Sequence, residues 1–167
     1  TALTRWIWDL GPLFQEKDIS TFLLGGRPET VAAAASHLGS RFSKLRLVGF
    51  HHGYFDWSGR ENAAVVDTIN RFAPNVLFVG FGIPKQELWI SQNSDRLNVN
   101  VIVPCGGMIH YLSGEIRKPP AWMSENGLEW LHRLAQDPRR LWRRYLWGNP
   151  VFMFNIFRDL VTRGRKR

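Results

Sequence analysis

The sequence has 167 residues, of which 44% are hydrophobic, and it carries a formal net charge of +8. A chain of this length and composition can bury the core of one folded domain, which excludes a disordered protein. No uninterrupted apolar run reaches the roughly 18–20 residues that are needed to cross a bilayer. The single cysteine, Cys105, excludes an intramolecular disulfide and fits a reducing compartment.

The positive charge is concentrated at one end of the chain. Residues 1–131 contain twelve Lys/Arg and twelve Asp/Glu, whereas residues 132–167 contain ten Lys/Arg and only two Asp/Glu. This asymmetry predicts an anionic partner for the C-terminal part: lipid headgroups, phosphate or nucleic acid.

Strand and helix signals alternate through the first two-thirds of the chain. Helices are expected from Pro28 to Leu38, with Gly39 as the stop, from about Ser58 or Gly59 to Phe72, and from Pro84 to about Asp95. Short apolar runs predict the strands between them, over residues 21–24, 45–50, 76–79 and 99–103. This order predicts an α/β, Rossmann-like fold: a mostly parallel sheet with helices on both faces.

Loops rich in glycine follow the predicted strands. The strands end at Gly25-Gly26, at residues 51–54, at residues 80–82 and at Gly106-Gly107. In a parallel sheet all four loops share one edge, where nucleotides commonly bind. Four loops in the same topological position favour a nucleotide-type site over four unrelated turns.

The segment after the third strand carries the most informative polar residues. Lys85 can neutralise a diphosphate, Gln86 can hydrogen-bond a sugar or base, and Glu87 can accept from a hydroxyl group. The spacing matches neither a P-loop nor the Gly-x-Gly-x-x-Gly of a dinucleotide fold. ATP hydrolysis and hydride transfer with NAD are therefore disfavoured, and no cofactor is expected.

The second loop contains two adjacent histidines. Because His51 and His52 lie on an extended segment, their side chains should point to opposite sides, and we expect no metal site. The neighbouring Gly53 and Tyr54 offer close backbone approach and an aromatic face for a base or sugar ring. The alternative is that Tyr54 and Phe55 belong to the core.

The C-terminal region changes character. A helix is expected over residues 122–134, and a second helix begins at Asp137-Pro138 and mixes arginine with Leu, Trp and Tyr. This mixture is typical of a helix that lies in a membrane interface. Nucleic-acid binding and clamping of a diphosphate by arginine are the alternatives. The apolar residues 152–157 favour the membrane surface.

Several of these motifs, in this order, resemble the bacterial WecG/TagA/CpsF glycosyltransferases. The matching segments are Leu24–Glu29, His52–Phe55, Val79–Glu87, Gly106-Gly107, Gly127–Leu134, Pro138–Arg140 and Arg143–Tyr145. The resemblance implies inverting, metal-independent transfer of a sugar from a UDP-sugar to an undecaprenyl-diphosphate-linked saccharide. Such an enzyme works in cell-surface polysaccharide synthesis, peripherally on the cytoplasmic face of the plasma membrane.

The resemblance also implies roles for particular residues. Gln86 and Glu87 would be catalytic, and the donor would be bound by Gly25, Gly26, Gly53, Tyr54, Gly82, Lys85 and Gln86. The diphosphate or lipid would face Arg139, Arg140, Arg143 and Arg144. The expected domains are a UDP-sugar-binding domain over residues 1–134 and a basic, membrane-associating appendage over residues 135–167.

One departure from the family concerns the catalytic base. Family members carry a further N-terminal region with an aspartate proposed as the base, and this sequence has no counterpart to it. We therefore expect a chain that holds the donor-binding half. The candidates for a base within the chain are His51, His52, Asp56 and Glu87. The rival functions are a nucleic-acid-binding module that uses the basic end and a non-catalytic, membrane-associated remnant.

Overall fold

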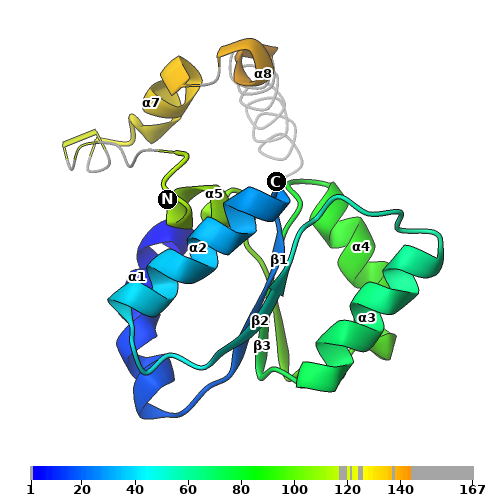
Figure 1. Ribbon diagram of the computed structural model, residues 1–167. Helices are drawn as coiled ribbons and strands as arrows, with labels where there is room; N and C mark the ends of the chain where they lie inside the picture. The colour runs from blue at the N-terminus through cyan, green and yellow to red at the C-terminus, as the bar shows by residue number, and fades with distance from the viewer. Residues whose placement is uncertain (1, 117–119, 121, 124–125, 137, 144–167) are drawn as a thin grey trace, which may run out of the picture. The chain divides into compact units, whose positions relative to one another are not determined.

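A four-stranded parallel sheet forms the centre of the computed structural model of this protein (Figure 1). The structure describes every residue except 1, 117–119, 121, 124–125, 137 and 144–167. The chain divides into two compact units, Thr1–Arg117 and Lys118–Arg167, and the sheet lies in the first. The boundary expected after residue 134 separates a donor-binding part from a membrane-associating part by function, and it stays a prediction.

The strands confirm the expected α/β, Rossmann-like class. Their order in the sheet is β2-β1-β3-β4, and all three pairs of neighbours are parallel. The chain therefore runs from β1 outward to β2 and then returns past β1 to β3, so the strand order reverses between β1 and β3. The strands span β1 Thr21–Gly25, β2 Leu47–His51, β3 Val76–Gly80 and β4 Val101–Pro104.

Helices cover both faces of the sheet. In Figure 1, α1 and α2 lie on one face and α3 and α4 on the other. The bounds of the helices in this unit are α1 Ala2–Glu16, α2 Pro28–Arg41, α3 Arg60–Phe72, α4 Lys85–Asn93, the 3-10 turn η1 Ser94–Arg96, and α5 Met108–Leu112.

The alternation of side chains along β1 and β3 creates two cores. Leu23 and Phe78 pack in a cluster with residues of α2 and α5, whereas Phe22, Leu24 and Leu77 pack with residues of α3 and α4. Successive strand residues point to opposite faces, so a strand covered on both sides is apolar throughout. Both strands are accordingly buried at all five positions.

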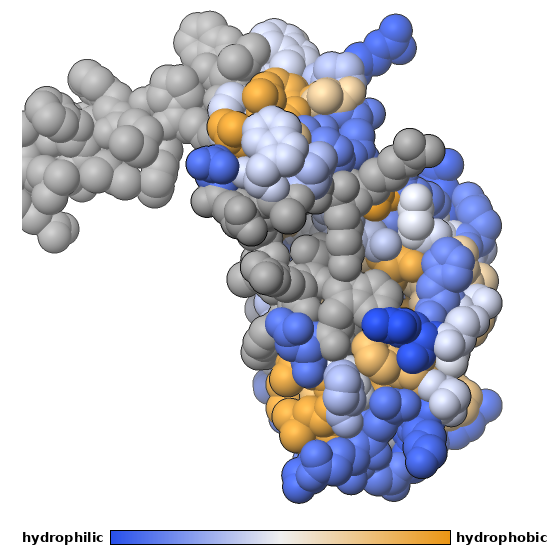
Figure 2. All heavy atoms as spheres, turned by 90° about the vertical axis from the view of Figure 1, so that its left-hand side faces the viewer, coloured by the Kyte–Doolittle hydropathy of each residue, from blue (hydrophilic) through white to orange (hydrophobic). Residues whose placement is uncertain are grey.

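The outer surface of the α1 and α2 layer is mostly hydrophilic. Figure 2 views this face and shows separate apolar patches among polar side chains. Glu29, Ser36 and Arg41 are among the exposed residues of α2. One side of this helix therefore faces solvent while Val31, Ala34 and Leu38 pack inward.

Glycines allow the ends of three strands to pack against one another. Gly25 has φ +144°, and a Cβ built on it would lie 2.5 Å from the carbonyl oxygen of Gly80. The Gly53 N–H donates to the carbonyl oxygen of Gly26 at 2.8 Å. A Cβ on Gly53 would meet the ring of Phe81 at 2.7 Å. These positions leave no room for a side chain.

Three helical features differ from the sequence-based expectations. The predicted stop at Gly39 is wrong: α2 continues to Arg41, and its end is marked by the Phe42 N–H, which donates to the Leu38 carbonyl oxygen. Nothing lies within 4 Å of the position where a Gly39 Cβ would be, so a solvent-facing glycine fits within the helix. Helices α1 and α5 were not predicted.

The second unit contains α7 Glu129–Gln136 and α8 Pro138–Arg143. The expected continuous helix over 122–134 is wrong in its middle, because Gly127 adopts φ +69° and turns the chain before α7. The predicted start of the next helix at Pro138 is confirmed. Residues 152–157 lie outside the described residues.

We expect Gly25→Ala to destabilise the protein by roughly 2–4 kcal/mol, because the new Cβ adds a left-handed backbone penalty to a clash with backbone. Chemical denaturation monitored by circular dichroism measures this change. Gly39→Ala is the matched control and should stabilise α2 by about 0.5–1 kcal/mol. Equal stabilities of the two variants would contradict the close approach of β1 and β3.

Candidate functional site

The loops that follow the four strands meet at the carboxyl edge of the sheet, as expected. The hydrogen bond from the Gly53 N–H to the Gly26 carbonyl oxygen links the loops after β1 and β2. A second hydrogen bond, from the Cys105 N–H to the Val79 carbonyl oxygen at 2.8 Å, links the ends of β3 and β4. The crevice at a reversal of strand order is the usual ligand position in open α/β sheets. Here that position lies between the ends of β1 and β3.

Gln86 fastens the start of α4 to the loop after β4. Its side chain is buried, and its Oε1 accepts from the Gly106 N–H at 2.9 Å. Its Nε2 donates to Glu87 Oε1, also at 2.9 Å. Both ends of the amide are thus engaged within the protein. Gln86 holds two loops of the site and orients the carboxylate of Glu87.

The residues beside Gln86 face outward. Lys85 and Glu87 are exposed on the first turn of α4. Gly82 has φ +79°, and no atom lies within 4 Å of the position where its Cβ would be. Of the glycines expected to bind a donor, Gly82 thus has open space beside it. At Gly25 and Gly53, neighbouring protein atoms occupy the space that a Cβ would need.

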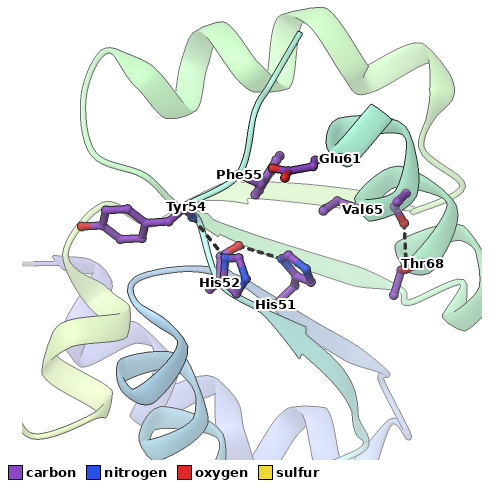
Figure 3. A pocket seen from close by; sticks show the side chains of 8 residues that line it. His51, His52, Tyr54, Phe55, Glu61, Val65 and Thr68 are labelled. Atoms are coloured by element: carbon purple, nitrogen blue, oxygen red, sulfur yellow. Dashed lines mark hydrogen bonds between the residues drawn. The ribbon is translucent and has the colours of Figure 1, made fainter. Parts of the chain in front are cut away.

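A pocket of about 270 Å³ opens at the end of β2 (Figure 3). Tyr54 is 67% exposed, which contradicts the alternative that it belongs to the core. Phe55 is half-buried and packs against the core cluster on the α3 side, so the alternative holds in part for this residue. Its side chain projects away from the other residues that Figure 3 labels. The pocket is lined by His51, His52, Tyr54, Phe55, Glu61, Ala64, Val65 and Thr68.

The side chains of His51 and His52 were expected to point to opposite sides, and this expectation is wrong. Their ring centroids are 4.3 Å apart, because His51 ends β2 and His52 lies beyond the strand, where alternation no longer applies. The His51 Nδ1–H donates to the His52 carbonyl oxygen at 2.8 Å. Within the described part of the chain, no three His, Cys, Asp or Glu side chains gather as a metal site would require.

His52 favours its neutral form. Burial lowers its pKa, the charge of His51 lowers it further, and Glu61 opposes both. Its Nδ1 accepts a long hydrogen bond of 3.3 Å from the Tyr54 N–H, which leaves Nε2 to carry the proton. His52 is therefore suited to donate a hydrogen bond to a ligand in the pocket.

Asp56 is poorly suited to serve as a base. Its Oδ1 accepts from the Ser58 N–H at 3.0 Å and from the Ser58 hydroxyl at 2.8 Å. These two bonds hold the pKa of Asp56 below its usual value. Asp56 stabilises the turn before α3.

A cluster that spans α2 and the end of α5 was not predicted from the sequence. Glu115 Oε1 accepts from the hydroxyl of Thr30, and its Oε2 binds His110 Nδ1 at 2.7 Å. His110 follows the Gly106-Gly107 loop by three residues, so its place at the carboxyl edge was available from the predicted topology. Its partner Thr30 is 85 positions from Glu115.

In the second unit, the structure places three of the four expected arginines on one helix. Arg139, Arg140 and Arg143 belong to α8, and Arg139 and Trp142 are exposed. Arg144 lies outside the described residues. Among the described residues, no helix is both long and apolar enough to cross a bilayer.

Comparison with known proteins decides the family. The model of the "Glycosyl transferase WecG/TagA/CpsF family" matches residues 1–166. The chain belongs to this family. The family inferred from the motifs is thus confirmed.

Two curated relatives come from Staphylococcus aureus. The protein from strain MW2 is 35% identical over 135 residues, which cover 81% of this chain and 51% of the relative. The protein from strain MRSA252 is 34% identical with the same coverage. Both are named N-acetylglucosaminyldiphosphoundecaprenol N-acetyl-beta-D-mannosaminyltransferase. The chain spans about half the length of the curated relatives it matches.

Cys105 should be inert in the folded protein. Burial raises the pKa of its thiol to about 12. Because the thiolate is the reactive form, iodoacetamide at pH 8 should label the native protein at least ~100-fold more slowly than the guanidinium-unfolded protein. Mass spectrometry follows the single modification. Equal rates in the two states would contradict the burial of Cys105.

Proposed function

We propose that this chain binds a UDP-sugar at the carboxyl edge of its sheet and takes part in sugar transfer to a polyprenyl-diphosphate-linked acceptor. The reaction would belong to the assembly of a bacterial cell-surface polysaccharide. The observation that carries the proposal is the family match over residues 1–166. The names of the relatives support a lipid-diphosphate acceptor.

The diphosphate of the donor is proposed to lie over the start of α4. Gly82 leaves space for close approach to the backbone, and free N–H groups of a first helical turn attract anions. Lys85 on the same turn adds a full positive charge. The nucleoside then extends toward the pocket at the end of β2, where His52 can donate a hydrogen bond and Tyr54 offers an aromatic face.

The groups that would catalyse the transfer are those near the negative charge that develops on the leaving UDP. The acceptor hydroxyl attacks the anomeric carbon from the side opposite UDP, and the bond to the diphosphate breaks. The negative charge that grows on the leaving phosphate is stabilised by backbone N–H groups and by Lys85. The exposed Glu87 is proposed to orient the sugar hydroxyls. Gln86 would act by positioning Glu87 and the Gly106 loop.

The basic second unit is proposed to hold the protein peripherally on the cytoplasmic face of the plasma membrane. Exposed Arg139 and Trp142 on α8 combine a cation for anionic headgroups with an aromatic ring for the interface. Each basic side chain near an anionic surface contributes about 1 kcal/mol. Arginine can also contact the diphosphate of donor or acceptor.

Removing the lysine at the start of α4 should weaken binding of UDP. We expect Lys85→Ala to lower the affinity about tenfold, since a hydrogen bond to a charged group contributes at least ~1.4 kcal/mol. Gln86→Ala should weaken binding as well, because the two loops lose their link. Isothermal titration calorimetry with UDP measures both. Lys44→Ala removes an exposed lysine near the opposite edge and should leave the affinity unchanged.

Charge removal on α8 should weaken membrane binding. We expect the double variant Arg139→Gln/Arg140→Gln to bind phosphatidylglycerol vesicles roughly 30-fold more weakly, at about 1 kcal/mol per arginine. Co-sedimentation at constant ionic strength measures the partition coefficient. The double variant Arg41→Gln/Arg71→Gln removes the same charge from the first unit and is the control. Tight, salt-dependent binding to RNA without vesicle binding would favour the nucleic-acid alternative.

A further inference from the structure

The ring of Phe81 lies where the two parts of the proposed donor site meet. Phe81 follows the last residue of β3 and precedes Gly82, the turn over which the diphosphate is proposed to lie. A Cβ built on Gly53, in the loop after β2, would lie 2.7 Å from this ring. The loop that borders the pocket and the turn that opens α4 are therefore in contact at Phe81.

Two aromatic side chains of the loop after β2 pack around Phe81. The ring of Phe55 lies edge-on, with 6.0 Å between the centroids, and that of Trp57 lies at 5.1 Å with 31° between the planes. Phe55 also lines the pocket, where its ring meets that of His51 edge-on at 5.7 Å. A displacement of the Phe81 ring would therefore move the wall of the pocket.

A third aromatic side chain contacts Phe81 from α4. Trp89 is fully buried and meets Phe81 edge-on at 5.6 Å. Its indole N–H donates to Asn62 Oδ1 on α3 at 2.8 Å. The amide of Asn62 donates in turn to Asn93 Oδ1 at 2.9 Å, and the amide of Asn93 donates to the Trp89 carbonyl oxygen at 2.8 Å. This closed circuit of buried hydrogen bonds holds Trp89, and with it the Phe81 ring, at a fixed place relative to α3.

Neighbouring hydrogen bonds extend this arrangement to the pocket and to the start of α4. Glu61, which precedes Asn62 on α3, lines the pocket (Figure 3), and its Oε2 accepts from the Asp56 N–H at 2.7 Å. The Gln86 N–H donates to the Gly82 carbonyl oxygen at 3.0 Å. The wall of the pocket and the Gly82 turn are therefore both continuous with the segments that the aromatic contacts join.

We propose that Phe81 is a positioning residue, whose ring sets the separation between the pocket for the nucleoside and the turn for the diphosphate. This inference rests on the proposed function. A ligand with two linked parts binds much more tightly than either part alone only when the protein holds the two sites at the matching separation. Phe81 acts here through the segments that it joins, and the role requires no contact with UDP.

Other contacts of the site join different pairs of segments. The hydrogen bond from Gly53 to Gly26 joins the loops after β1 and β2, and Gln86 joins α4 to the loop after β4. Phe81 joins the loop after β2 to α4, and these two segments carry the proposed contacts with the nucleoside and the diphosphate. Its truncation should loosen this one connection while the others stay in place.

The test compares UDP with its two parts. Dissociation constants of the protein for UDP, uridine and inorganic pyrophosphate are measured by protein-observed NMR titration at one pH and ionic strength. In Phe81→Ala, the Kd for UDP should rise at least about tenfold while the Kd values for uridine and pyrophosphate stay within about twofold of wild type. A residue that touches the ligand, or one that only maintains the fold, would change the affinity for a part as well.

Two further variants control for a general loss of packing. Phe81→Leu keeps a large apolar side chain at the position, so its Kd for UDP should rise only about threefold, again with both parts bound as in wild type. If circular dichroism shows Phe81→Ala to be unfolded, Phe81→Leu decides the comparison. Phe72→Ala removes a ring that pairs with Phe22 at 6.0 Å at the end of α3, and it should leave all three constants unchanged.

An unchanged Kd for UDP in the folded variant of Phe81 would overturn the proposal. An equal loss of affinity for UDP and for one of its parts would overturn it as well. So would a wild-type protein that binds UDP no more tightly than it binds uridine or pyrophosphate. Failure of the wild-type protein to bind UDP at all overturns the proposed function itself.

Discussion

The close approach of β1 and β3 at their carboxyl ends is the constraint on which the site depends. The two strands pair in register from Thr21 and Val76 to Gly25 and Gly80, where backbone meets backbone. Any side chain at Gly25 would force β1 and β3 apart at the point where the strand order reverses. The glycines of this edge therefore serve mainly to bring the loops together. Contact with the donor is proposed for residues at the rim of the site, such as Gly82 and Lys85.

The sequence was sufficient to predict the sheet but not all of its helices. Each strand is a short apolar run that ends at a turn signal, and each is present. Helix α5 has five residues, too few to show a helical period, and in α1 Gly11 and Pro12 obscure the pattern. At Gly39 a stop signal was outweighed by the packing of the surrounding helix. Capping signals act locally, and tertiary contacts can override them.

Single side chains of the site were harder to predict than its location. Gln86 lies between Lys85 and Glu87 in sequence, yet it is buried while they are exposed, because successive helical residues point about 100° apart. The ring contact of His51 and His52 depends on where β2 ends, which a pattern fixes only to within a few residues. The link from Thr30 to Glu115 joins distant segments, so it becomes visible only once α2 and α5 are packed together.

The amide of Gln86 has a consequence for the thermodynamics of ligand capture. Because it joins α4 to the loop that precedes α5, the groups proposed to meet the donor at the start of α4 are held by the end of β4 as well. Little loop ordering then remains to oppose association, and the reacting atoms start from a favourable orientation. Severing this link should appear first as an entropic loss, even where every group that touches the substrates is still present.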